Sequence, residues 1–76
     1  MNELDRIIMN PRVMTGRPCI RGMRITVGTI VGLVAAGHPW AEIRENYPEL
    51  EDEDIRQALY YAKWRCEEQE VEVAVA

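Results

Sequence analysis

Three residues of this chain are the first candidates for a nucleophile, a base near neutral pH or a soft metal ligand. They are Cys19, Cys66 and the single histidine, His38. Catalysis of this kind needs a nucleophile, a base and a stabilising group held together, and His38 stands beside Pro39 in an expected turn with no evident partner. The spacing of the three residues also lacks the paired ligands of a zinc site. We therefore predict that the chain is not an enzyme and needs no metal or cofactor.

Cys19 has two interpretations. A small, buried, apolar side chain is the favoured one, and a reactive thiol beside Arg17 and Arg21 is the alternative. Two cysteines are too few to staple a small secreted domain, so we expect both to be free thiols in a reducing compartment. The N-terminus lacks the features of a secretory signal, and the longest apolar stretch is too short to span a bilayer. We expect a cytoplasmic protein without a membrane segment.

Arginines supply the clearest chemical signal. Arg17, Arg21 and Arg24 lie within eight residues around Pro18 and Gly22, and Arg12 precedes them. A guanidinium group is a planar fork that pairs with a carboxylate or a phosphate through two hydrogen bonds. Three kinds of hydrogen-bond acceptor are possible for these arginines: acids of the protein's own third helix or of a dimer mate, carboxylates of a partner protein, and phosphates of nucleic acid. We take Arg12, Arg17, Arg21 and Arg24 as candidate partner-binding residues.

The charge of the chain is split between its two halves. The formal net charge is -4, but residues 1–41 carry +3 and residues 42–76 carry -7. A basic surface attracts polyanions and an acidic one repels them, so the halves are suited to different partners. The alternative is that the two halves pair with each other within a dimer. A chain of this size is only marginally stable alone, and we expect it to form a homodimer.

The elements that position these residues follow from the apolar pattern. Residues 6–25 contain two prolines and two glycines, which favours short strands around Ile7–Met9 and Val13–Met14 joined by turns. Thr26 is expected to cap a first helix that ends at Gly37, and Pro39 confirms the break. A short second helix is closed by Pro48.

The third and longest predicted helix opens at the acidic run Glu51–Asp54, where negative charge suits the helix dipole. Its expected inward face is Ile55, Ala58, Leu59, Ala62 and Cys66, and Tyr60 and Trp64 form a separate flank that is a candidate interface.

Beyond the third helix the pattern changes. Val71, Val73 and Val75 alternate with Glu70, Glu72 and Ala74, which is a strand pattern without a hairpin partner. This end either frays or adds a strand to a partner's sheet, so Val71 and Val73 join the candidate partner-binding residues. We predict an arm over residues 1–25, a helical core over 26–66 and an acidic tail over 67–76.

Three helices joined by tight turns are the parts of a helix-turn-helix domain. The expected fold class is therefore mainly α, a three-helix homeodomain-like helix-turn-helix with a short N-terminal β element. In such a domain the third helix would read the DNA, and here it begins with four acids that phosphates would repel. The arginines before Ile25 are better placed to contact nucleic acid.

Several short motifs together resemble a known family. They are N-P at Asn10, G-R-P at Gly16 and I-R-G-M-R-I at Ile20, followed by Gly37, Ile43, Tyr47 and Pro48 and then by Asp54, Ile55, Ala58, Leu59, Tyr61 and Ala62. This combination, over residues 6 to about 66, is similar to domain of unknown function family 433. Members look like VapB-class antitoxins of type II toxin-antitoxin pairs, with PIN-like ribonucleases as toxins and a homeodomain-like fold.

The resemblance implies an antitoxin that binds and silences a ribonuclease and regulates its own promoter. The chain departs from the family pattern at Pro39 and Glu51, where relatives carry a Ser or Thr cap. Two other function classes stay open: a stand-alone helix-turn-helix regulator that binds DNA, and an oligomeric scaffold whose Tyr60 and Trp64 flank is buried between copies.

Overall fold

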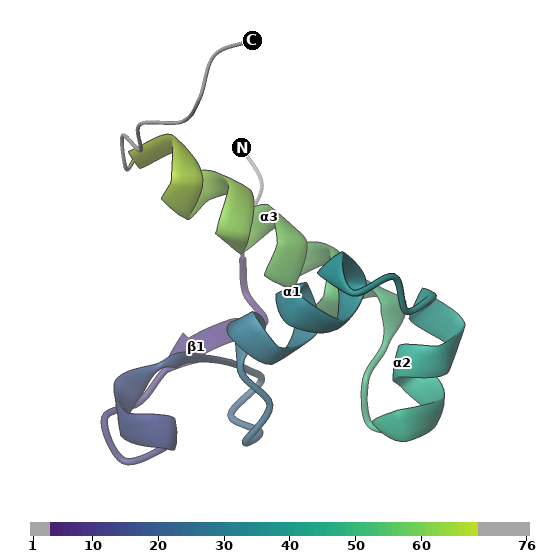
Figure 1. The fold of residues 1–76 in the computed structure, drawn as a ribbon. Coiled ribbons are helices and arrows are strands. Elements are labelled where there is room, and N and C mark those ends of the chain that lie inside the picture. Colours follow the sequence, from purple (N-terminus) through teal and green to yellow (C-terminus); the bar gives the residue numbers. More distant parts are fainter. Residues whose placement is uncertain (1–3, 69–76) are drawn as a thin grey trace, which may run out of the picture.

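The computed structural model describes residues 4–68, which form three helices and a small two-stranded antiparallel sheet (Figure 1). The predicted partner-binding residues Val71 and Val73, and the tail after Glu68, lie outside this range. The elements follow in the order β1 (Ile7–Met9), the 3-10 turn η1 (Met14–Gly16), β2 (Pro18–Ile20), α1 (Val27–Ala35), α2 (Trp40–Asn46) and α3 (Asp52–Glu68). The mainly helical class with an N-terminal β element is confirmed.

The β hairpin pairs β1 with β2 in the register Ile7 with Ile20, Ile8 with Cys19 and Met9 with Pro18. The Arg21 N–H donates to the Arg6 carbonyl at 2.7 Å, one of the two bonds of a hydrogen-bonded pair, while the Arg6 N–H donates to Gln57. Hydrogen-bonded and non-hydrogen-bonded pairs alternate along an antiparallel ladder. Pro18 therefore falls in a non-hydrogen-bonded pair, where its missing N–H costs nothing.

The predicted strand at Val13–Met14 is wrong. Met14, Thr15 and Gly16 have φ values of 49°, 56° and 81°, so three consecutive residues are left-handed and the chain turns. The Val13 N–H donates to the Asn10 carbonyl at 2.9 Å, and the Gly16 N–H donates to the Val13 carbonyl at 3.0 Å. The turn that follows Pro11 overrides the strand preference of Val13, and the second strand forms later, at Pro18–Ile20.

The helix boundaries agree with their local signals. The Thr26 hydroxyl accepts a hydrogen bond from the Thr29 N–H at 3.1 Å, which confirms the predicted cap of α1. Gly37 ends that segment with φ at 92°, in the left-handed region that favours glycine. Pro39 begins α2 without a side-chain hydrogen bond, as the departure from the family pattern predicts. No helix among residues 4–68 has the length and apolar character to cross a bilayer.

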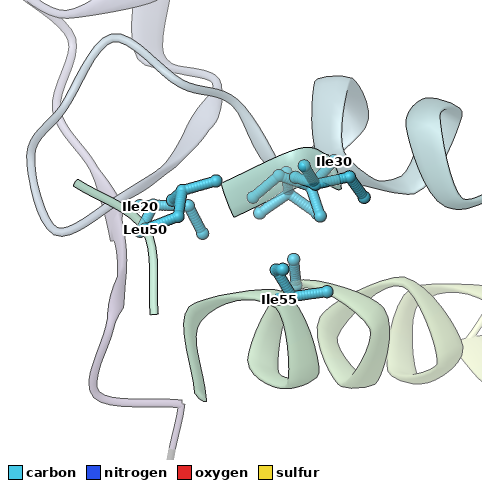
Figure 2. Close-up of a cluster of buried hydrophobic side chains, with 7 residues drawn as sticks. Ile20, Ile30, Leu50 and Ile55 are labelled. Atoms are coloured by element: carbon cyan, nitrogen blue, oxygen red, sulfur yellow. The ribbon is translucent and has the colours of Figure 1, made fainter. Parts of the chain in front are cut away.

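The core lies between α1 and α3 and is closed by side chains from β2, α2 and the turn before α3. Figure 2 shows Ile20, Ile30, Leu50 and Ile55 pointing toward one another. The buried apolar side chains of the cluster are Ile20, Val27, Ile30, Ile43, Leu50, Ile55 and Ala58. Because Ile20 belongs to the hairpin, the hairpin and the helices share one core.

The prediction that Cys66 faces inward is wrong, since its side chain is exposed. Ile55 and Ala58 are fully buried, whereas Leu59 and Ala62 are half-buried. The inward face of α3 thus loses its cover along the helix, because the C-terminal half of α3 extends past the other elements (Figure 1). Side chains of this projecting half line a groove on the surface.

Candidate partner-binding site

A tight turn sets the direction of Arg21. Arg21 and Gly22 have φ values of 47° and 77°, and the Met23 N–H donates to the Ile20 carbonyl at 2.7 Å. Two central residues with positive φ are characteristic of a type I′ turn, in which arginine is an uncommon first residue. A left-handed arginine costs some backbone energy, so its side chain needs a compensating contact.

Asp54, in the first turn of α3, is that contact. Its side chain is fully buried and accepts hydrogen bonds from Arg21 Nε at 3.0 Å and from a terminal nitrogen of Arg21 at 2.9 Å. Arg6 donates to the same carboxylate at 3.1 Å, and the Glu51 N–H donates to it at 2.8 Å. Arg21 also donates to the Glu49 carbonyl at 2.7 Å. Of the acceptors left open for Arg21, the structure shows the acidic start of the protein's own third helix.

The charge on Asp54 is stabilised by these donors. Burial on its own raises the pKa of Asp54, but the hydrogen bonds from Arg21, from the Glu51 N–H and from Arg6 outweigh it, and the net pKa lies below 3.8. The carboxylate is therefore ionised at neutral pH. The bond from the Glu51 N–H is one half of a capping box, which replaces the missing Ser or Thr cap at this helix start.

Arg6 and Gln57 complete the connection between the hairpin and α3, and the sequence reasoning did not single out either. The Arg6 N–H donates to Gln57 Oε1 at 3.0 Å, and Gln57 Nε2 donates to Asp5 at 2.9 Å and to Glu53 at 2.9 Å. Gln57 is buried with its amide fully bonded. The sequence signals for this cluster were Arg21 and Asp54 within the family motifs and the placement of Asp54 three residues after Glu51, the capping position of α3.

The acidic run is paired internally. Arg6 contacts Glu51 at 2.6 Å, Arg44 contacts Asp52 at 2.9 Å, and Arg56 contacts Glu53 at 2.5 Å, in addition to the pairs at Asp54. The bonds from Arg56 and Gln57 lower the pKa of Glu53 to about 2. Every acid of this run has a basic partner, so the run is less repulsive toward phosphates than its sequence indicates.

The remaining predicted arginines are differently placed. Arg12, Arg17 and Arg24 are exposed, and none of their guanidinium groups contacts a carboxylate among residues 4–68. Arg12 and Arg17 belong to the loop of the hairpin, and Arg24 follows the Arg21-Gly22 turn. We call these two segments, residues 10–17 and 21–25, the arginine loops. In Figure 1 they lie well away from the projecting half of α3.

The predicted aromatic flank forms one wall of a groove of about 580 Å³ between α3 and the start of the chain. Tyr60 and Trp64 are 37% and 45% exposed, and Met9 across the groove is 62% exposed. The Tyr61 and Trp64 rings are tilted at 59° with centroids 5.8 Å apart, and Lys63 Nζ lies 5.6 Å from the centre of the Tyr60 ring. The lining is completed by Leu4, Ile7, Tyr61, Lys63 and Glu67. The sequence analysis identified Tyr60 and Trp64 but not Leu4, Ile7 and Met9, which line the opposite side of the groove.

The histidine and the buried cysteine each have a local hydrogen-bond partner. His38 Nδ1 lies 2.8 Å from Glu42 in a partly exposed pair, so the prediction that it has no partner is wrong. Cys19 is buried and its thiol donates to the Arg17 carbonyl at 3.3 Å, which agrees with the packing interpretation. Among residues 4–68, no three His, Cys, Asp or Glu side chains are grouped so that they could hold a metal ion.

Comparison with known proteins gives consistent results. A family model described as "Protein of unknown function (DUF433)" matches residues 7–62. The chain is 37% identical over 57 residues to "Uncharacterized protein y4eO" of Sinorhizobium fredii (strain NBRC 101917 / NGR234), a match that covers 75% of this chain and 26% of that protein. The crystal structure of a DUF433 member from Anabaena variabilis ATCC 29413 superposes with a TM-score of 0.76 at 36% identity, covering 83% of this chain and 62% of the other.

Both similarities extend over most of this chain, which spans about a quarter of the Sinorhizobium protein and under two thirds of the Anabaena chain. The matched segment contains the hairpin, both arginine loops, α1, α2 and the first part of α3. The chain therefore belongs to the DUF433 family of proteins of unknown function.

Proposed function

We propose that this chain is an antitoxin, which binds a PIN-like ribonuclease toxin and neutralises it by placing arginines against the toxin's acidic active site. The observation that carries the proposal is the division among the N-terminal arginines. Arg6 and Arg21 hold Asp54, whereas Arg12, Arg17 and Arg24 are exposed and have no carboxylate partner among the described residues.

The chemistry of the two surfaces supports this pairing. A PIN-like ribonuclease gathers carboxylates to hold its metal ions, and an arginine fork is complementary to a carboxylate in shape and charge. Arg17 precedes Pro18, and Arg24 follows the type I′ turn, so both project from restrained backbone. Restrained loops lose less conformational entropy on binding than mobile ones do. Arginines from these loops would cover the cluster and exclude the RNA or its metal ion.

The test is inhibition of the cognate ribonuclease by the variant Arg12→Ala/Arg17→Ala/Arg24→Ala. We expect its inhibition constant to rise at least ~30-fold, since truncating charged contacts at an interface costs roughly 2 kcal/mol or more in total. The matched control is Arg44→Ala/Arg56→Ala, which also removes arginines but only ones paired within the chain. Full inhibition by the triple variant, with normal circular dichroism, contradicts the proposal.

Arg21 is left out of this variant for a structural reason. Its guanidinium group holds a buried carboxylate, so its removal disturbs the start of α3 as well as the surface. A loss of inhibition in an Arg21 variant would not separate binding from folding.

The second candidate is a homeodomain-like helix-turn-helix regulator that binds DNA, either alone or as the promoter-binding role of an antitoxin. The observation in its favour is that the acids at the start of α3 are paired internally, which lowers their repulsion toward phosphates. Contact through Arg12, Arg17 and Arg24 would give a slope of log K against log salt of about -3 per chain. If the chain does not bind the DNA next to its gene at low salt, this candidate function is excluded.

A further inference from the structure

We propose that the groove beside Tyr60 and Trp64 is the contact surface for a second copy of this chain, with the two α3 helices packed antiparallel about a two-fold axis near Trp64. This inference is independent of the antitoxin proposal, because the groove and the arginine loops are separate surfaces. It assigns the homodimer expected from the sequence to one defined face.

The middle of this surface is apolar. Leu4, Ile7 and Met9 face Tyr60, Tyr61 and Trp64 across the groove. Large aromatic side chains gain much of their stabilisation from burial, and fully buried aromatic anchors dominate protein interfaces. Met9 and Trp64 keep 62% and 45% of their surface in contact with solvent. A partner that covers this groove therefore buries Met9, Tyr60 and Trp64, three of the four large apolar side chains that the described residues expose; the fourth is Ile8.

The charged rim indicates that the partner is another copy. Lys63 and Glu67 both line the groove, four residues apart on α3, and they form an ion pair with each other. In an antiparallel two-fold arrangement centred between them, Lys63 of one copy faces Glu67 of the other, and the same contact recurs by symmetry. A two-fold interface must be self-complementary in this way. An apolar centre with one positive and one negative rim residue meets that requirement.

The position of the groove also allows a second copy to approach it. Among residues 4–68, no other helix lies beside the projecting half of α3 (Figure 1), so a second α3 can approach along its length. Among residues 4–68, the core cluster of a single copy contains only seven buried apolar side chains. Small domains bury a low fraction of their surface on folding, so they gain the most from a second apolar contact.

The experiment is sedimentation equilibrium of the full chain over a concentration series, with three single variants. Trp64→Glu should be monomeric with unchanged circular dichroism, because Trp64 lies on the surface of α3. Lys63→Glu and Glu67→Lys should each weaken self-association roughly tenfold, since each places like charges opposite one another twice. The control is Arg12→Glu, a charge reversal on the arginine loops, which should leave the dimer intact.

Mixing the two charge variants separates contacts between copies from contacts within one helix. Lys63→Glu and Glu67→Lys both break the ion pair within α3, so a structural role of that pair predicts weak association alone and in the mixture. The two-fold arrangement predicts that the mixture forms a heterodimer, because acidic residues of one variant then face lysines of the other. Association restored only in the mixture supports the proposal.

Three results overturn it. The first is a wild-type chain that stays monomeric up to about 1 mM, a concentration well above the dissociation constants of specific dimers. The second is a dimer that Trp64→Glu leaves unchanged, which places the interface elsewhere. The third is a monomer in which Val71→Lys/Val73→Lys shifts the Trp64 fluorescence to the red in a Trp40→Phe background, since the chain's own C-terminal residues would then occupy the groove.

Discussion

The substitution Asp54→Asn tests the physical basis of the link between the hairpin and α3. It keeps the size of a fully buried side chain and removes its charge. The carboxylate accepts hydrogen bonds from Arg6, from two nitrogens of Arg21 and from the Glu51 N–H, at 2.8 to 3.1 Å. In the variant, one amide oxygen must serve these donors, and the amide N–H groups would point at a guanidinium group.

The expected loss of unfolding free energy is about 3 kcal/mol. Breaking a buried ion pair by removing one partner typically costs about 3 to 5 kcal/mol. The lower end applies here, because the Arg6 and Arg21 side chains are 27% and 40% exposed and can turn toward water. A domain of this size has a total stability of roughly 4 to 11 kcal/mol, so the loss is a large fraction of it.

The assay is urea denaturation followed by circular dichroism at 222 nm. With an m-value of about 1 kcal/mol/M for a small domain, the midpoint should fall by about 3 M. The matched control is Asp52→Asn, two positions earlier in the same helical turn, where an exposed carboxylate pairs with Arg44. The control should lose less than about 1 kcal/mol. Equal midpoints for the two variants would refute the reasoning.

The pH dependence of the unfolding free energy tests the same interaction of Asp54. The pKa of Asp54 in the folded chain lies below its ordinary value of 3.8. The unfolded state therefore binds the proton more readily, and the contribution to stability is present above about pH 3.8 and lost as the pH falls further. Asp54→Asn should accordingly lose less stability than the wild type between pH 5 and pH 2.

Three further predictions concern single residues. Thr26→Ala removes the acceptor of the Thr29 N–H and should cost about 1 kcal/mol in a thermal melt, whereas Thr26→Ser should cost less. Ile55→Ala leaves a cavity at the centre of the core and should cost about 2 to 5 kcal/mol by urea denaturation; a loss below 1 kcal/mol would contradict the packing in Figure 2. Glu53→Gln should flatten the acid-unfolding curve below pH 4.5, because the pKa of Glu53 is lowered to about 2 by Arg56 and Gln57; an unchanged curve would contradict that assignment.

Local signals were sufficient for the helices. Thr26 at the start of α1 and Gly37 after it act through the backbone nearest to them, so the sequence predicts both boundaries without any knowledge of the fold. The spacing of Ile55 and Ala58 likewise identifies the buried face of α3. The prediction for Cys66 fails because helical spacing defines a face but not the point where its cover ends.

The site depended on contacts between residues far apart in the chain. Nothing in the sequence around Arg21 distinguishes it from Arg17 or Arg24, since all three are arginines near a proline or a glycine. Only the packed hairpin brings Arg21 to a carboxylate 33 positions later and leaves Arg17 and Arg24 without such a partner among residues 4–68. The sequence therefore determined where the arginines lie along the chain, and the tertiary structure decided which of them form ion pairs within residues 4–68, because an ion pair depends on distance in space.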